Sequence, residues 1–168
     1  MSDYQPPCPL LDKHNLDDFD WGVPGLNDWL KRRARRNEES GASRTYVVCD
    51  QQDNVLGYYC LANGSVMLNE VPKKMKRNMP DPIPVMIIGR LAVDLKHKKK
   101  GVGPGLLRDA VSRVLKAGEI GGIRAILVHA ISDEAMDFYL RNGFLKCPFN
   151  PMMSMLPIKP INIDKQSS

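Results

Sequence analysis

Long hydrophobic runs are absent from this chain of 168 residues. No stretch of about 18 apolar residues occurs, so the sequence contains no candidate for a transmembrane helix. The first twenty residues, MSDYQPPCPLLDKHNLDDFD, also lack the basic start and the apolar run of a secretory signal. These absences lead us to expect a cytoplasmic protein that does not associate with a membrane.

Cysteine is scarce, and its four copies are scattered rather than arranged as C-x-x-C pairs. This pattern argues against a zinc site and against a disulfide framework, so we expect no metal and reduced thiols. Cys49 and Cys60 lie inside apolar runs typical of strands, where a buried and inert thiol is the favoured interpretation.

Positive charge is unevenly distributed, although the net charge of +5 is modest. Basic residues cluster at positions 31–36, 73–77 and 96–100. Single runs of this kind are usually solvated surfaces, but three of them on one small domain favour a polyanionic partner.

Hydrophobic periodicity predicts one domain built on a mixed α/β sheet. We expect this domain at 26–157, between an N-terminal extension at 1–25 that drapes over it or frays and a flexible tail at 158–168. A short helix is expected to begin after Ser132 as its N-cap and to stop at Asn142. The other predicted elements are helices at 26–39 and 104–117, strands at 44–49, 55–62, 85–93 and 123–130, and an edge strand at 152–156.

A basic turn that contains glycine joins the most apolar strand to the helix at 104–117; positions 90–107 read RLAVDLKHKKKGVGPGLL. Backbone N–H groups and the positive end of the helix dipole can bind a diphosphate at such a turn. Gly101 and Gly103 allow close approach of the backbone, and the lysines at 98–100 add attraction. The turn lacks G-x-G-x-x-G and G-K-S/T, which disfavours dinucleotides and ATP.

Two motifs in this order resemble those of the GNAT (Gcn5-related N-acetyltransferase) superfamily. The run KKKGVG at 98–103 matches its coenzyme loop Q/R-x-x-G-x-G/A, with Lys98 in the first position. Positions 132–144 match N-x-x-A-x-x-F-Y-x-x-x-G-F, with Ser132 in place of Asn. The resemblance covers about 85–144 and implies a mixed, mostly antiparallel sheet with central splayed parallel strands, flanked by helices.

The resemblance also implies acetyl-CoA as cosubstrate and an acetyltransferase reaction. Tyr139 is then the general acid that protonates the departing thiolate, although a helix tyrosine packed into the core is the alternative. His129 is either a proton relay or, as we favour, a hydrogen-bonded strand residue. The residues implied in coenzyme binding are Leu91, Ala92, Val93, Lys98, Lys99, Lys100, Gly101, Val102, Gly103, Pro104, Ser132 and Phe138.

Further segments resemble one bacterial subgroup, the GNAT toxins of type II toxin–antitoxin modules. They are positions 28–30, 41–49, 57–66, 77–85 and 89–94, so the similarity spans about 26–144. The subgroup implies acetylation of the α-amino group of aminoacyl-tRNA, inhibition of translation, a ribbon-helix-helix antitoxin and a homodimer. Cationic residues suit a tRNA substrate. The candidates are Arg32, Arg33, Arg36, Lys73, Lys74, Lys76, Arg77 and Arg90, with Arg77 and Arg90 expected nearest the acceptor end.

An α-amino group with a pKa of about 7.7–8.0 is present in part as the neutral amine at cellular pH, so no strong general base is required, and Asp94 is the alternative base. We expect the amine to attack the thioester directly, without a covalent enzyme intermediate. Neither Cys60 nor Cys147 is therefore expected to act as a nucleophile. Two other functions stay open. One is a GNAT enzyme that acetylates a protein or small-molecule amine, and the other is a non-catalytic module that binds nucleic acid.

Overall fold

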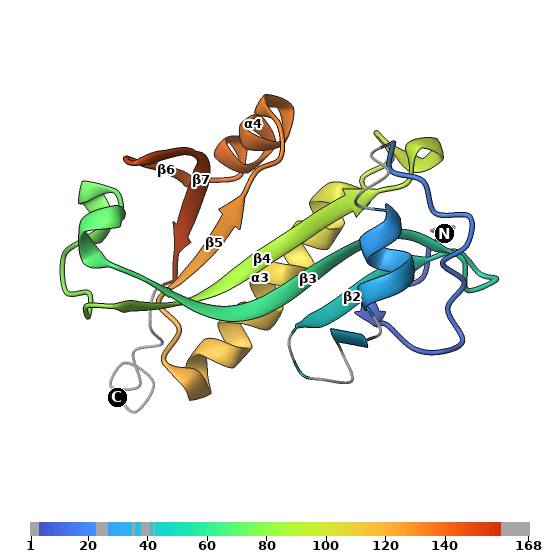
Figure 1. Cartoon of the computed structure of the whole chain (residues 1–168), viewed down its shortest axis with the longest axis horizontal. Helices are drawn as coiled ribbons and strands as arrows, with labels where there is room; N and C mark the ends of the chain where they lie inside the picture. The colour runs from blue at the N-terminus through green and yellow to red at the C-terminus, as the bar shows by residue number, and fades with distance from the viewer. Residues whose placement is uncertain (1–3, 23–26, 35, 38–40, 42, 159–168) are drawn as a thin grey trace, which may run out of the picture. The chain divides into compact units, whose positions relative to one another are not determined.

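The computed structural model describes residues 4–22, 27–34, 36–37, 41 and 43–158 (Figure 1). Of Trp29 and Arg33 it describes the backbone alone. Most of the tail predicted at 158–168 and both ends of the helix predicted at 26–39 lie outside these residues. The chain forms two compact units, the first from 1–62 and 88–110 and the second from 63–87 and 111–168.

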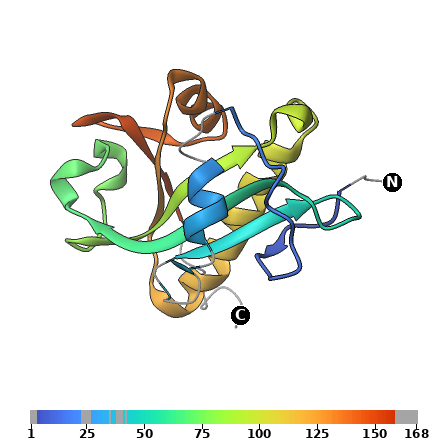
Figure 2. The ribbon, with the colours of Figure 1, turned by 45° about the vertical axis from the view of Figure 1, so that its right-hand side comes forward.

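Four strands are neighbours at one end of the strand order (Figures 1 and 2): β1 (Cys8–Pro9), β2 (Arg44–Cys49), β3 (Val55–Val66) and β4 (Ile83–Val93). They lie mainly in the first unit, whereas residues 63–66 of β3 and 83–87 of β4 belong to the second. β2 is antiparallel to both β1 and β3, and Tyr46 lies opposite Tyr59. β2 has its predicted bounds, whereas β3 continues four residues beyond the predicted end at 62. Apolar runs bounded by turn residues therefore located the central strands correctly.

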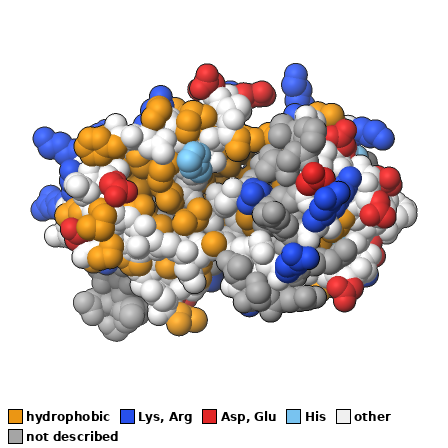
Figure 3. Space-filling model, viewed as in Figure 1, with side chains coloured by type: hydrophobic (Ala, Val, Ile, Leu, Met, Phe, Trp, Pro, Cys, Tyr) orange, Lys and Arg blue, Asp and Glu red, His pale blue; other side chains and the backbone are white. Residues whose placement is uncertain are grey.

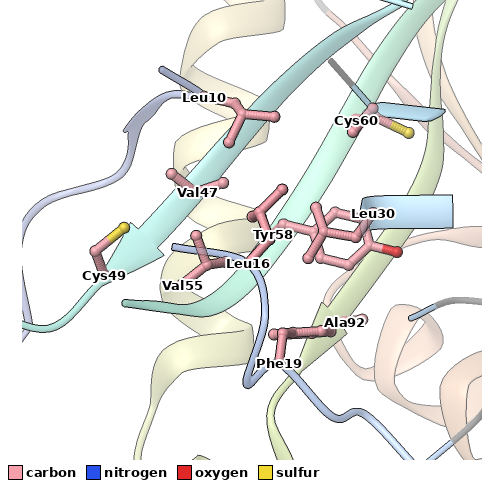
Figure 4. Close-up of a cluster of buried hydrophobic side chains, with 11 residues drawn as sticks. Leu10, Leu16, Phe19, Leu30, Val47, Cys49, Val55, Tyr58, Cys60 and Ala92 are labelled. Carbon is pink, nitrogen blue, oxygen red and sulfur yellow. The ribbon is translucent and has the colours of Figure 1, made fainter. Parts of the chain in front are cut away.

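The described N-terminal residues are part of the core of the first unit (Figure 4). Leu10, Leu16 and Phe19 are buried, and the rings of Phe19 and Tyr58 meet edge to face with centroids 5.5 Å apart. Residues 4–22 therefore do not fray but supply apolar surface that closes one face of β2 and β3.

The helical segment that follows is a π-helix, η1 (Trp29–Arg33), within helical residues 27–34. Leu30 and Ala34 are fully buried, whereas Lys31, Arg32 and Arg36 are exposed. The described part of the helix predicted at 26–39 is therefore amphipathic, with the cations on its outer face.

Three strands and a helix characterise the second unit: β5 (Ala125–His129), β6 (Leu145–Cys147), β7 (Asn150–Pro157) and α4 (Asp133–Arg141). The strand order continues β3-β4-β5-β7-β6, and β7 is antiparallel to both its neighbours. The strand predicted at 152–156 is present as β7, but its predicted place at the edge of the sheet is wrong, because β6 pairs along the outer side of β7. A strand of three residues leaves too short a pattern to be recognised.

Helix α3 (Val102–Gly121) connects β4 to β5, which are adjacent and point the same way (Figure 1). The predicted mixed and mostly antiparallel sheet is thus confirmed. α3 begins two residues before and ends four residues after its predicted bounds, and Gly122 follows it with a φ of 71°. Among the described residues, no helix has the length and apolar character needed to cross a membrane.

Candidate coenzyme and catalytic residues

The predicted diphosphate loop, Lys98–Gly103, lies between a short 3₁₀ helix, η4 (Leu95–His97), and the N-terminus of α3 in the first unit. The backbone has positive φ angles at Lys99 (64°) and Gly101 (85°). A Cβ at Gly101 would have no atom within 4 Å, so this side of the backbone is open. The first turn of a helix leaves N–H groups without helical partners. An anion that approached Gly101 would therefore meet unpaired donors and the positive end of α3.

Lysine charge surrounds this loop. Lys98, Lys99 and Lys100 are all exposed, and none forms an ion pair with another described residue. The Nζ atom of Lys98 lies 5.5 Å from the centroid of the Trp21 ring, a cation–π distance. Sequence reasoning missed Trp21, because nothing in its local pattern relates it to a residue 77 positions later.

Close packing fixes the start of α3 against the strands. A Cβ at Gly57 on β3 would lie 3.0 Å from side-chain atoms of both Val102 and Leu106 and 3.3 Å from the Ala92 carbonyl oxygen. Only glycine allows β3 to approach α3 and β4 this closely. Three candidate coenzyme-binding residues lie on β4. Ala92 is fully buried, and Leu91 and Val93 are half-buried.

Asp94, the alternative general base, is used structurally. Its carboxylate accepts hydrogen bonds from the backbone N–H groups of Lys96 and Asp20, both at 2.9 Å, and its exposed fraction is 6%. The N–H of Asp94 donates to the carbonyl of Leu56 at 2.8 Å. A carboxylate that caps η4 in this way has a structural reason to be present, and the geometry gives no support to its use as a base.

The buried thiols are poor nucleophiles. Burial raises the pKa of Cys49 to about 12, and burial also raises the pKa values of Cys60 and Cys147. At Cys60 the nearby Arg90 guanidinium opposes this rise. The predicted burial of Cys49 and Cys60 is confirmed. The thiolate is the reactive form of cysteine, so their raised pKa values support the interpretation that they are inert.

Tyr139 lies in the second unit on α4, and its side chain is 6% exposed. Its ring packs against Phe138 and Phe144, with centroids 5.3 and 5.4 Å away. The Phe144 N–H donates to the Tyr139 carbonyl at 3.2 Å, so this hydrogen bond joins Phe144 to the last turn of α4. Packing therefore restricts the direction of the phenol. This restriction is compatible with both interpretations of Tyr139, a positioned general acid and a tyrosine packed into the core.

The N-terminus of the same helix carries Ser132, whose Oγ accepts a hydrogen bond from the Ala135 N–H at 3.1 Å. The predicted N-cap is confirmed. His129, the last residue of β5, is exposed and makes no side-chain hydrogen bond with the described residues. The interpretation of His129 as a hydrogen-bonded strand residue is therefore wrong for the part of the chain described.

The candidate tRNA-binding cations fall in both units. Lys73 and Lys74 begin the 3₁₀ helix η3 (Lys73–Met75), and they are exposed together with Lys76 and Arg77. Arg32 and Arg36 are exposed in the first unit, where Arg90 is half-buried, and the side chain of Arg33 lies outside the described atoms. No group of three or more His, Cys, Asp or Glu residues within the described ranges could hold a metal ion.

Comparison with known proteins identifies the family. Residues 9–144 match the model of the acetyltransferase (GNAT) family. The chain belongs to this family. It is 44% identical over 159 residues to a tRNA-acetylating toxin of Mycobacterium tuberculosis (strain ATCC 25618 / H37Rv), with 95% of each chain covered.

Two solved structures are similar to this GNAT protein over nearly the whole chain. AtaT complexed with acetyl-methionyl-tRNAfMet is 28% identical with a TM-score of 0.87, and the match covers 99% of this chain and 100% of that one. A mutant AtaT toxin bound to the C-terminus of the antitoxin AtaR and acetyl-CoA is 27% identical with a TM-score of 0.79, covering 93% and 94% of the two chains.

Proposed function

We propose that this GNAT enzyme transfers the acetyl group of acetyl-CoA to the α-amino group of an aminoacyl-tRNA and thereby inhibits translation as the toxin of a type II toxin–antitoxin module. The observation that carries this proposal is the 44% identity, over 95% of both chains, to a tRNA-acetylating toxin. The similarity to AtaT in complex with an acetylated aminoacyl-tRNA supports the same substrate.

In this proposal the loop at 98–103 holds the diphosphate of acetyl-CoA. The open backbone at Gly101 and the exposed lysines at 98–100 fit such an anion. Backbone groups of Leu91, Ala92 and Val93 bind the pantetheine arm in the manner of a strand, and an N–H among them donates to the acetyl carbonyl. Val102, Pro104, Ser132 and Phe138 complete the coenzyme-binding residues.

The reaction needs one acid and no strong base. The neutral α-amino nitrogen attacks the thioester carbonyl, so that an N–C bond forms while the C–S bond breaks. Tyr139 gives its phenolic proton to the departing sulfur, and the amine loses its proton to solvent. A backbone N–H of β4 stabilises the oxyanion that develops on the acetyl oxygen.

The exposed cations bind the phosphates of tRNA. Arg32, Arg33 and Arg36 form one such group, and a second lies at Lys73, Lys74, Lys76 and Arg77, with Arg77 and Arg90 nearest the acceptor end. Contacts between cationic side chains and nucleic acids go mostly to phosphates, and such contacts carry little sequence information. Affinity for tRNA should therefore fall steeply as the salt concentration rises.

Protein partners are also proposed: a ribbon-helix-helix antitoxin and a second copy of this chain in a homodimer, with the module acting in the cytoplasm. Hydrophobic side chains gather at the surface over β5 and β7 in the second unit (Figure 3). Ile131 follows β5 by two residues, Phe149 directly precedes β7, and both are exposed. Apolar patches of this kind mark contacts with other proteins. The AtaT structure that contains an antitoxin C-terminus supports the first partner.

Labelled acetyl-CoA incubated with total charged tRNA tests the function. The label should appear on the aminoacyl group of tRNA, and Tyr139→Phe should reduce its transfer by at least a hundredfold, because general acid catalysis contributes roughly this much. Tyr46→Phe, which removes the same atom from a half-buried tyrosine of β2, is the matched control and should retain activity. Label on protein or on added polyamine instead of tRNA would replace the proposed substrate.

A further inference from the structure

Two reciprocal hydrogen bonds join the N-terminal segment to the residues just before the coenzyme loop. The Asp20 N–H donates to a carboxylate oxygen of Asp94 at 2.9 Å, and the Leu95 N–H donates to the carbonyl of Asp20 at 2.8 Å. The other carboxylate oxygen of Asp94 accepts the Lys96 N–H. One buried carboxylate thus connects the end of β4, the start of η4 and a segment 74 residues earlier in the chain.

The turn at Asp20 is itself held in one conformation. Its carboxylate accepts hydrogen bonds from the Gly22 N–H at 2.8 Å and from the Asn27 side-chain amide at 3.0 Å. The Asn27 side-chain oxygen in turn accepts the Trp21 N–H at 2.9 Å. The hydrogen bond from Asn27, followed by that from Gly22, lowers the pKa of Asp20, so this carboxylate is ionised at neutral pH. The turn presents the Trp21 ring to Lys98, the first residue of the loop.

A third contact reaches the last residue of η4. The Tyr4 hydroxyl lies 3.1 Å from Nδ1 of His97, and the two rings meet edge to face with centroids 5.6 Å apart. Tyr4 precedes Gln5, whose N–H donates to the Cys49 carbonyl at 2.8 Å and fixes this part of the segment on β2. η4 is therefore contacted from two separate parts of the N-terminal segment.

We propose that residues 4–22 are a positioning element for the coenzyme loop and that Asp94 is the positioning residue through which they act. The loop begins directly after η4, so the position of η4 sets where the backbone of Lys98–Gly103 starts, while α3 sets where it ends. The inference rests on the proposed function, because it assigns this loop to the diphosphate of acetyl-CoA. Asp94 itself contacts no reacting atom in this account.

Calorimetric titration with coenzyme A and steady-state kinetics with acetyl-CoA test the inference. Asp94→Asn keeps the size of the side chain but removes one of its two acceptor oxygens. We expect the Kd for coenzyme A and the KM for acetyl-CoA to rise about tenfold, with kcat at saturating acetyl-CoA within twofold of the unsubstituted protein. The matched control is Asp81→Asn, since Asp81 also accepts a distant backbone N–H, from Leu68 at 3.0 Å in the second unit. This control should leave both constants unchanged.

The outcomes separate the inference from the function on which it rests. A fall in kcat with retained affinity for coenzyme A would make Asp94 the general base and overturn the inference. If Asp94→Asn does not fold, Tyr4→Phe decides: removal of this one hydroxyl should raise the Kd about two- to threefold, and an unchanged Kd overturns the inference. No heat with the unsubstituted protein would instead overturn the proposed use of acetyl-CoA.

Discussion

The guanidinium of Arg124 donates a hydrogen bond to the backbone carbonyl of Asn78 at 2.8 Å. Asn78 has a φ of 60° and directly follows the basic run that ends at Arg77. The backbone of Arg124 also forms two hydrogen bonds, both at 2.9 Å. Its N–H donates to the carbonyl of Pro84, and its carbonyl accepts from the N–H of Ile158. Arg124, which directly precedes β5, thus contacts the loop that follows the second candidate tRNA-binding group.

Arg124→Met should weaken tRNA binding without removing a phosphate contact. We expect the Kd for tRNA to rise roughly three- to tenfold, because the loop loses one hydrogen bond that orders it. The slope of log Kd against log salt should stay the same, whereas Arg77→Ala should reduce that slope by about 1. Filter binding of uncharged tRNA at several KCl concentrations measures both quantities.

Arg141→Met provides the control for loss of a cation, since Arg141 is an exposed residue at the end of α4. It should change neither the Kd nor the slope. A reduced slope for Arg124→Met would mean that Arg124 contacts a phosphate itself, and the positioning role would then be wrong.

Cysteine alkylation should discriminate sharply among the four thiols. With a pKa of about 12, Cys49 has about one thiolate in ten thousand molecules at pH 8, and it is buried. Burial also protects Cys60 and Cys147, whereas Cys8 is half-buried. Iodoacetamide at pH 8 followed by peptide mass spectrometry should find Cys8 modified first in the native protein and all four modified in urea. Rapid native labelling of Cys60 would contradict the burial argument.

The hydroxyl of Tyr59 on β3 donates a 2.5 Å hydrogen bond to the carboxylate of Asp109 on α3. Tyr59 is fully buried and its ring stacks on Tyr46. Tyr59→Phe should lower the free energy of unfolding by about 1–3 kcal/mol, because the half-buried carboxylate of Asp109 loses a donor. Urea unfolding followed by circular dichroism gives this value. Tyr46→Phe is the comparison, and an equal loss in both variants would show that the bond to Asp109 adds nothing specific.

Local patterns were sufficient for much of the fold. Alternating and continuous apolar runs located β2 with its observed bounds, and Ser132 identified the cap of α4 because capping involves only residues three apart. The position of β7 between β5 and β6 could not be predicted, since strand order depends on pairing between distant segments. Leu115 has the helical spacing of a core residue, four positions after Val111 on α3, but it is 43% exposed, so helical spacing alone did not separate core from surface there.

The candidate site divides in the same way. The glycine positions and lysines of the coenzyme loop are recognisable because they are contiguous in sequence. The contacts of Asp20 with Asp94 and Leu95 and the contact of Trp21 with Lys98 were not predicted. The N-terminal segment is rich in Pro, Asp and Gly and has no periodicity, and these partners lie more than 70 positions away. Asp94 was considered a possible base because the sequence does not reveal the two backbone N–H groups that its carboxylate binds, those of Asp20 and Lys96.

The N-cap of α4 connects stability to Tyr139, the proposed catalytic residue that the helix carries. Ser132→Ala removes the acceptor of the Ala135 N–H and should cost about 1 kcal/mol in the free energy of unfolding. Ser132→Asn retains an acceptor at the same place, matches the residue of the family motif and should cost little. If the cap also positions Tyr139, kcat falls in the alanine variant and recovers in the asparagine variant. A loss of kcat in both variants would show that the proposed contact of Ser132 with the coenzyme depends on the serine hydroxyl itself, and a loss in neither would leave the cap a purely structural feature of this helix.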